Sequence, residues 1–183
     1  GLNSRRLFTY AEKIKDGRFL FMRHQKNPSA KNYSTAEYPN QTYVREELTD
    51  AITYLKVGSF SSYYPKLSDA EQFYETLQGT LNNPHLIIDL RTNSGGGVRN
   101  SGILFKMLKE YTKKNKLYLI VNHRTVSNAE QFTLRAKGLG NCLVFGDQTN
   151  GTLSYEVKGC SFSLPCGVFK TTLAAKKHAK YLD

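Results

Sequence analysis

The chain has 183 residues, which is enough for one sizeable hydrophobic core and requires no second domain. Hydrophobic residues make up 39% of it, with 12 Tyr and 10 Phe, and this composition excludes a disordered chain. The formal net charge of +11 comes from scattered basic residues without a zinc spacing or an aromatic-basic platform, so we expect no nucleic acid partner.

Membrane and targeting signals are missing from the sequence. No apolar run reaches the roughly 18 to 20 residues that a membrane helix requires, so no membrane span is expected. The N-terminus lacks the order of basic, apolar and small residues that marks a signal peptide, which fits either a cytoplasmic protein or a piece of a longer precursor. Cys142, Cys160 and Cys166 have no metal-ligand spacing, and we expect neither a metal nor another cofactor.

The first fifty residues show weak periodicity. Residues 19–22 are apolar, and a polar stretch rich in Asn, Ser, Lys and Tyr follows over 25–43. We therefore expect residues 1–50 to form an N-terminal segment of strand and loop, consistent with the remnant of an upstream module. Residues 51–183 are expected to form the principal domain, which could be truncated at both ends.

Regular elements begin after residue 50. The β-branched and aromatic residues of 52–57 predict a strand. Ser68 and Glu71 have the spacing of a capping box, and apolar residues recur at four-residue steps, so a helix is predicted over 68–82. Residues 86–90 form a nearly continuous apolar run, which is typical of a strand covered on both faces of a parallel sheet.

The same cycle of strand and helix then repeats. A helical face is predicted from Ile103, Leu104, Met107, Leu108 and Tyr111. Further strands are predicted over 117–121 and 142–145, with a helix over about 128–137 between them. The tail over 155–173 predicts a β-hairpin turned at Cys166-Gly167. Alternating strands and helices predict an α/β fold with a mainly parallel sheet and right-handed crossovers.

A glycine-rich turn joins the predicted strand at 86–90 to the next helix, with Gly95, Gly96 and Gly97 in succession. Glycine lets the backbone take positive φ angles and approach a ligand closely, so successive N–H groups can converge on a negative oxygen. Such a turn suits an oxyanion or a phosphate, although the spacings of a dinucleotide site and of a P-loop are missing. It could also serve only as a tight connection between strand and helix.

Ser127 also stands between a predicted strand and a predicted helix. A serine hydroxyl can be held exposed at the end of a sheet in this position, and the amide of Asn128 would then point toward any oxyanion that forms. Ser127 and Glu130 also have the spacing of a capping box. From spacing alone, Ser127 is more often a helix cap than a nucleophile.

Four motifs follow one another along the chain: Asp89-Leu90-Arg91-x-Asn93-x-Gly95-Gly96, Leu119 to Asn122, Thr125-x-Ser127-x-Ala129-Glu130 and Val144-x-Gly146-Asp147-x-Thr149-x-Gly151. Over roughly residues 51–172 this order resembles the tail-specific, or C-terminal processing, serine protease family. The resemblance implies a crotonase-like or Clp-protease-like α/β core of repeated β-β-α units over 51–183. It also implies cleavage of polypeptides, often near their C-termini, outside the cytoplasm in the periplasm or cell envelope.

Within this resemblance Ser127 is the nucleophile of an acyl-enzyme mechanism. The oxyanion hole would be formed by the amides of Gly95, Gly96 and Asn128. The bacterial processing proteases carry a lysine base directly after the glycine of the last motif, where this chain has Thr152. Threonine cannot act as a base, so a Ser-Lys dyad is not expected.

A serine nucleophile needs a general base, and histidine is the usual one because its pKa lies near neutral pH. The lysine-free pattern resembles tricorn-type and retinoid-binding-protein-type relatives, and in tricorn-like peptidases the base is a histidine upstream of the catalytic core. We therefore expect the base to lie upstream of this chain. His123, four residues before Ser127, is the candidate within the chain, ahead of His24, His85 and His178.

Two functions are consistent with these residues. The first is a serine peptidase that cleaves a polypeptide with Ser127 and an oxyanion hole at Gly95–Gly97. The second is a non-catalytic module that binds a peptide or another ligand with the same fold after losing its base, as the retinoid-binding relatives suggest. Labelling of Ser127 by a serine-directed reagent distinguishes them.

Overall fold

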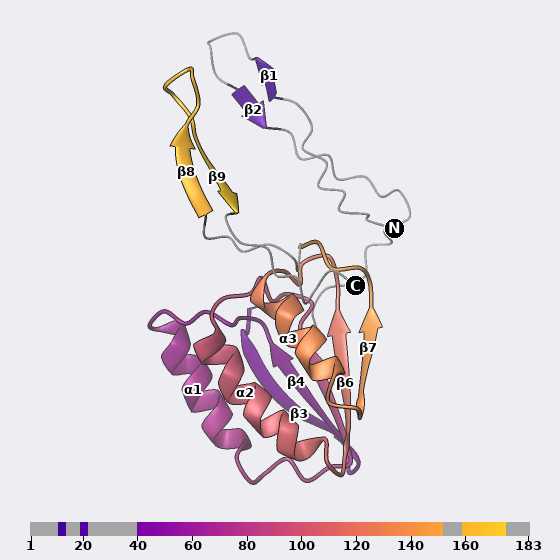
Figure 1. Cartoon of the computed structure of the whole chain (residues 1–183). Coiled ribbons are helices and arrows are strands. Elements are labelled where there is room, and N and C mark those ends of the chain that lie inside the picture. The colour runs from indigo at the N-terminus through magenta and orange to yellow at the C-terminus, as the bar shows by residue number, and fades with distance from the viewer. Residues whose placement is uncertain (1–10, 14–18, 22–39, 152–158, 175–183) are drawn as a thin grey trace. The chain divides into compact units, whose positions relative to one another are not determined.

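The computed structural model describes residues 11–13, 19–21, 40–151 and 159–174 (Figure 1). The chain divides into two compact units, Gly1–Glu37 and Tyr38–Asp183. In the first unit, β1 (Ala11–Lys13) and β2 (Phe19–Phe21) pair in antiparallel orientation. The second unit contains the other elements, and it is the unit that holds the candidate site.

A five-stranded sheet with the order β3-β4-β5-β6-β7 forms the centre of the second unit. Its strands are β3 (Tyr43–Thr49), β4 (Ile52–Val57), β5 (His85–Asp89), β6 (Lys116–Val121) and β7 (Cys142–Gly146). β3 runs antiparallel to β4, and the other three pairs are parallel. The predicted mixed α/β fold with a mainly parallel sheet is confirmed. β3, although it lies within residues 1–50, is an edge strand of this sheet.

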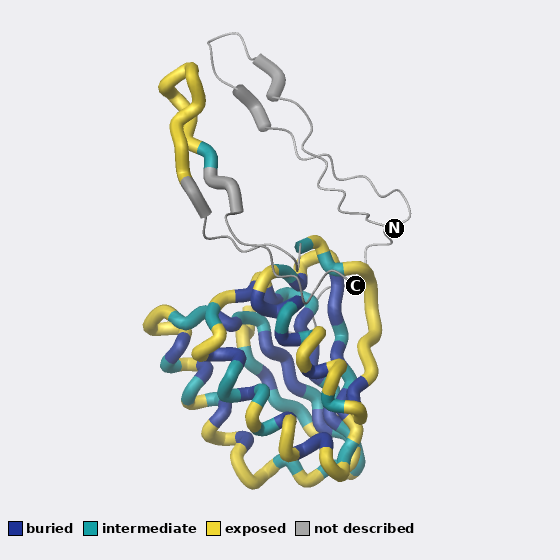
Figure 2. Tube along the Cα trace, in the orientation of Figure 1, coloured by how far each residue is buried: buried dark blue, intermediate teal, exposed yellow. Residues whose placement is uncertain are grey.

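Three helices lie on one face of this sheet, namely α1 (Lys66–Leu77), α2 (Val98–Tyr111) and α3 (Asn128–Lys137) (Figure 1). Alternate strand residues face them and are fully buried, as Figure 2 shows along the central strands. These include Leu55, Leu86, Ile88, Leu117 and Leu119. Their burial supplies the main stabilising free energy of the unit, because each removes a large apolar side chain from water.

The predicted helix over 68–82 has different ends in the structure. It begins at Lys66, because Pro65 at the N-cap has its φ already fixed near the helical value, and Ser68 lies inside the first turn rather than capping it. It ends at Leu77, because Gly79 takes a φ of 69° and directs the chain out of the helix. By contrast, the helix predicted over 128–137 coincides with α3.

The predicted C-terminal hairpin is confirmed for the residues that the structure describes. β8 (Gly159–Ser163) and β9 (Lys170–Ala174) pair in antiparallel orientation. Gly167 has a φ of 71°, and its amide donates to the Leu164 carbonyl 2.8 Å away, which closes the turn at the predicted place. None of the helices in the described ranges is long and apolar enough to cross a membrane.

Candidate active site

The candidate site lies where two neighbouring parallel strands end. The glycine turn follows β5, and the segment that contains Ser127 follows β6. Because the carboxyl ends of parallel strands meet at one edge of a sheet, both segments lie at the same edge, which is where α/β folds commonly bind their ligands. The motifs that are separated in the sequence are therefore neighbours in the fold.

Ser127 has an unusual backbone conformation. Its φ is 58° and its ψ is −124°, and it is the only non-glycine residue with a positive φ in the part of the chain that the structure describes. Such a conformation costs about 1 to 3 kcal/mol and persists only where the surroundings impose it. A sharp, strained turn between strand and helix is the arrangement that exposes a nucleophilic serine in α/β-hydrolases. Ser127 is accordingly exposed, at the N-cap of α3.

The Glu130 side chain binds the Ser127 backbone. Its buried carboxylate, only 4% exposed, accepts the Ser127 amide at Oε2 over 2.6 Å and the Gly151 amide at Oε1 over 2.9 Å. The predicted capping box between Ser127 and Glu130 is confirmed. A Cβ on Gly151 would lie 1.8 Å from Glu130 Oε2, so a side chain there would displace this carboxylate. The last motif is thus joined to the serine through one carboxylate.

The glycine turn packs against Phe60, which comes from the loop after β4. The Phe60 amide donates to the Gly95 carbonyl over 3.0 Å, and the Gly97 amide donates to the Phe60 carbonyl over 2.7 Å. Gly96 has a φ of 143°, and a Cβ there would lie 2.0 Å from the Phe60 carbonyl oxygen. Glycine is therefore required at this position by both the backbone conformation and the close approach.

Gly95 has a different role from the one expected. Its amide donates to Asn93 Oδ1 over 2.9 Å, so the expectation that it supplies a free N–H for an oxyanion is not met. Instead, a Cβ on Gly95 would lie 2.7 Å from the Val126 carbonyl oxygen and 2.9 Å from Ser127 Cβ. Gly95 therefore allows the turn to pack directly on the serine segment.

Two amides at this junction are available. In the described ranges, no hydrogen-bond acceptor is found for the amides of exposed Gly96 and of Asn128, the first residue of α3. The first amides of a helix have no partner within the helix, and the helix dipole favours negative charge there. The junction between turn and helix is thus suited to a negative oxygen.

Two buried side chains tie the turn and the serine segment to the sheet. Asn93 donates from Nδ2 to the Val57 carbonyl over 3.0 Å, and the main-chain carbonyl of Asn93 accepts the Val126 amide over 3.2 Å. Thr125 donates from Oγ1 to the Leu90 carbonyl over 2.8 Å and accepts the Asn122 amide over 3.1 Å. Asn93 and Thr125 both belong to the sequence motifs. The sequence does not predict that they hold the two loops, because their partners are main-chain atoms that no spacing reveals.

Thr125→Val should lower the free energy of unfolding by about 2 kcal/mol, because it keeps the shape but leaves the buried amide of Asn122 without a partner. Thr133→Val is a matched control, since the Thr133 hydroxyl donates only to the Ala129 carbonyl of its own helix. We expect a change of about 0.5 kcal/mol or less for the control. Urea denaturation measures both, and equal losses would contradict the role given to Thr125.

The structure does not join His123 to Ser127. His123 is exposed at the corner of a turn closed by the Thr125 amide and the Asn122 carbonyl, and no hydrogen bond links it to Ser127. His85 lies where β5 begins, at the opposite end of the parallel strands from Ser127. Its Nδ1 is 3.1 Å from the Tyr118 hydroxyl. His24, His178 and Thr152 lie outside the described residues.

A partly buried ion pair precedes the glycine turn. Asp89, 3% exposed, accepts from Arg91 Nη2 over 2.7 Å and from the Tyr54 hydroxyl over 2.8 Å. The hydrogen bond to Asp89 raises the pKa of Arg91, and burial raises the pKa of Tyr54 well above its usual value. Arg91 therefore stays charged and Tyr54 neutral at ordinary pH. These fixed groups hold the start of the turn.

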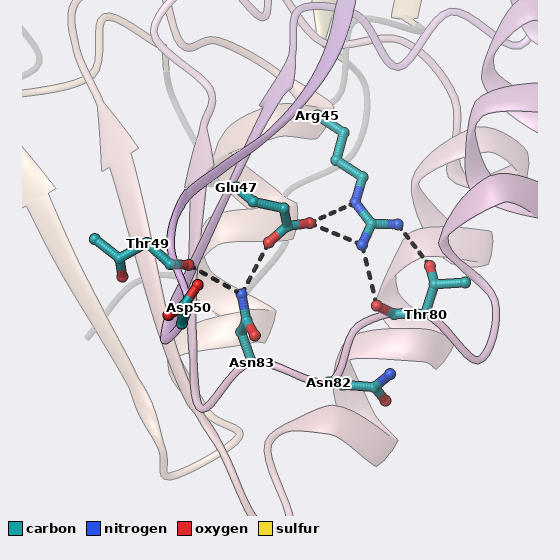
Figure 3. A pocket seen from close by; sticks show the side chains of 7 residues that line it. All are labelled: Arg45, Glu47, Thr49, Asp50, Thr80, Asn82 and Asn83. Carbon is teal, nitrogen blue, oxygen red and sulfur yellow. Dashed lines mark hydrogen bonds and ion pairs between the residues drawn. The ribbon is translucent and has the colours of Figure 1, made fainter.

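A polar hollow of about 340 Å³ lies elsewhere, at the edge where β4 and β5 begin (Figure 3). It is lined by Arg45, Glu47, Thr49, Asp50, Thr80, Asn82 and Asn83. Arg45 donates to Thr80 Oγ1 over 2.6 Å, and Asn83 donates to Glu47 Oε2 over 2.8 Å. Arg45 and Asn83 thus join β3 to the loop after α1. Within the described ranges, no cluster of His, Cys, Asp and Glu could hold a metal ion.

No protein-family model matches the chain, and no curated protein matches it significantly. Solved structures do match it. A lipoprotein from Streptococcus agalactiae is 22% identical with a TM-score of 0.53, over 75% of this chain and 58% of that one. The photosystem II D1 C-terminal processing protease is 18% identical with a TM-score of 0.51, over 69% of this chain and 37% of that one.

A third solved structure, a peptidase candidate from Parabacteroides merdae, is 19% identical with a TM-score of 0.51, over 76% of this chain and 55% of that one. This chain spans less than two thirds of the length of each of these three proteins. At these identities the matches establish a shared fold. The α/β fold of the chain is therefore one that peptidases also use.

Proposed function

We propose that this domain belongs to a serine peptidase of the tail-specific type, with Ser127 as the nucleophile and a polypeptide as the substrate. The observation that carries the proposal is the strained Ser127 backbone, packed on a glycine turn beside two amides without acceptors in the described ranges. The shared fold with the D1 processing protease and the four ordered motifs support the same assignment.

In the proposed mechanism, Ser127 Oγ forms a bond to the scissile carbonyl carbon, and the carbonyl electron pair moves onto its oxygen. The amides of Gly96 and Asn128 stabilise that oxyanion, and each such donor contributes about 3 to 4 kcal/mol in serine proteases. Collapse of the intermediate expels the amine, which takes up a proton, and leaves an acyl-enzyme that water hydrolyses. Gly95 contributes by permitting the close approach.

The hydroxyl proton requires a base. Thr152 stands where the processing proteases have lysine, and His123 makes no hydrogen bond to Ser127. We propose that a histidine from a segment upstream of this core supplies the base, as in the tricorn-like pattern. The matched structures extend well beyond the length of this chain, which is consistent with further residues contributing to the site.

We propose that an extended substrate adds to a sheet edge by β-augmentation. β7 is suited to this, because it is an edge strand whose Leu143, Val144 and Phe145 side chains are exposed and uncharged. β3, the other edge, carries Arg45, Glu46 and Glu47, which discourage pairing with another strand. A location outside the cytoplasm is proposed from the resemblance and from the lipoprotein among the matched structures.

Labelling of the full-length protein with an alkyl fluorophosphonate tests the proposal. Wild-type protein should take up one label per chain, and Ser127→Ala should take up none. Ser94→Ala is the matched control, because Ser94 is an exposed serine in the facing turn, and this variant should label normally. Label retained by Ser127→Ala would refute the assignment of the nucleophile.

The alternative is a peptide-binding module that has lost its base. The absence of a hydrogen bond between Ser127 and a histidine in the described ranges, together with Thr152 at the lysine position, favours this second function. A full-length protein that binds peptides but takes up no label at Ser127 would establish it.

A further inference from the structure

Asn128 contains a buried acceptor without a partner. Its side chain is only 6% exposed, yet Oδ1 makes no hydrogen bond, and it is the only such buried side-chain atom in the described ranges. Buried polar groups in folded proteins are nearly always hydrogen-bonded, and leaving one unpaired is costly. An unpaired carbonyl oxygen therefore indicates a donor from beyond the residues that the structure describes.

Asn128 itself lies beside the glycine turn. Asn128 shares a helical face with Phe132 and Arg135, which are four and seven residues further along α3. Phe132 packs on Phe60 with ring centroids 4.9 Å apart, so this face of α3 is turned toward the loop after β4, against which the glycine turn packs. A Cβ on Gly95 would lie 3.0 Å from the Asn128 amide nitrogen.

The free groups of this junction match the chemistry of a peptide unit. Two amides, those of Gly96 and Asn128, await an acceptor, and Asn128 Oδ1 awaits a donor. A peptide group presents one carbonyl acceptor and one N–H donor. A carboxylate or a fully ionised phosphate ester would satisfy the two amides but carries no hydrogen to donate to a carbonyl oxygen. The set of groups thus favours a polypeptide over a small anion.

We propose that Asn128 Oδ1 accepts a hydrogen bond from a main-chain N–H of the polypeptide bound at Ser127. Asn128 is then a substrate-binding residue that reads the peptide backbone rather than a side chain. This inference rests on the proposed function only for the location of the peptide. It applies equally to a peptidase and to a peptide-binding module.

The experiment uses the full-length protein with Ser127→Ala, so that binding is measured without cleavage. The probe is the peptide Ac-Ala-Ala-Tyr-Ala-Ala-amide, together with analogues in which one amide at a time is replaced by an ester. NMR titration gives each Kd. Asn128→Leu should weaken binding of the parent peptide about tenfold, because one buried hydrogen bond is lost. One ester analogue should bind the protein with Asn128 about tenfold more weakly than the parent peptide does. The same analogue should bind Asn128→Leu no more weakly than the parent peptide does.

Two further measurements separate binding from structure. Asn128→Leu should unfold at an equal or higher urea concentration, because an unpaired polar group is replaced by an apolar one of similar size. Asn115→Leu is the matched control, since Asn115 is half-buried in the loop before β6, and this variant should bind the peptide normally.

Equal binding of every probe to the Asn128 and Asn128→Leu proteins, or no binding to either, would overturn the inference. The outcome is separate from that of fluorophosphonate labelling. Serine-dependent labelling without an effect of Asn128 on binding refutes only this inference. An effect of Asn128 on binding without labelling refutes only the catalytic proposal.

Discussion

Thr152→Lys should raise the rate at which Ser127 of the 183-residue chain reacts with a fluorophosphonate by about 100-fold, because it supplies a general base. One carboxylate, that of Glu130, accepts both the Ser127 amide and the Gly151 amide. Residue 152 follows Gly151 directly, and consecutive Cα atoms are about 3.8 Å apart. Position 152 is where the processing proteases carry their lysine base, and the carboxylate that binds the neighbouring Gly151 also binds Ser127.

The pH dependence identifies the mechanism of this gain. A lysine base acts only when it is neutral, so the labelling rate of Thr152→Lys should rise with pH and level off above the pKa of the new lysine. Thr152→Arg is the matched control, because arginine adds the same charge but is not deprotonated in proteins. Gln148→Lys adds a lysine at an exposed position four residues earlier in the chain. A gain of equal size in either control would show that charge alone is responsible.

Local patterns predict the elements whose stabilising contacts are local. β4 coincides with its predicted range of 52–57, and α3 with 128–137, because strand composition and a capping box are both visible in the sequence. β3 was not predicted, because an edge strand that carries Arg45, Glu46 and Glu47 shows no apolar alternation. Its identity depends on pairing with β4, which is a tertiary contact.

The candidate site, like the fold, is predicted by the sequence only in part. The sequence predicts which loops meet, since the order of strands and motifs determines the edge of the sheet. It does not predict that the Asn93 side chain takes the amide of Gly95, nor that Oδ1 of Asn128 is buried without a partner. Both facts depend on where a side chain points once the loops are packed, and one changes the composition of the proposed oxyanion hole from three amides to two.

Glu130→Gln tests whether the strained serine is held in place by the carboxylate. Both oxygens of Glu130 accept an amide, from Ser127 over 2.6 Å and from Gly151 over 2.9 Å. Glutamine has one acceptor oxygen, and its NH₂ group would face the second amide N–H. We expect the free energy of unfolding to fall by about 2 kcal/mol, because one buried amide loses its partner.

The same substitution should slow fluorophosphonate labelling of Ser127 about 100-fold, because a displacement of about 1 Å in a reacting group has an effect of that size. Tyr74→Phe is the control for stability, since it removes a buried hydrogen bond to Asn100 in which neither Ser127 nor Glu130 takes part. Glu110→Gln is the control for charge, because Glu110 is exposed and pairs with Lys113. Labelling at the wild-type rate in Glu130→Gln would show that the Ser127 backbone keeps its conformation without the carboxylate. The strain at Ser127 would then have to be imposed by the packing of the Gly95 turn on its other side.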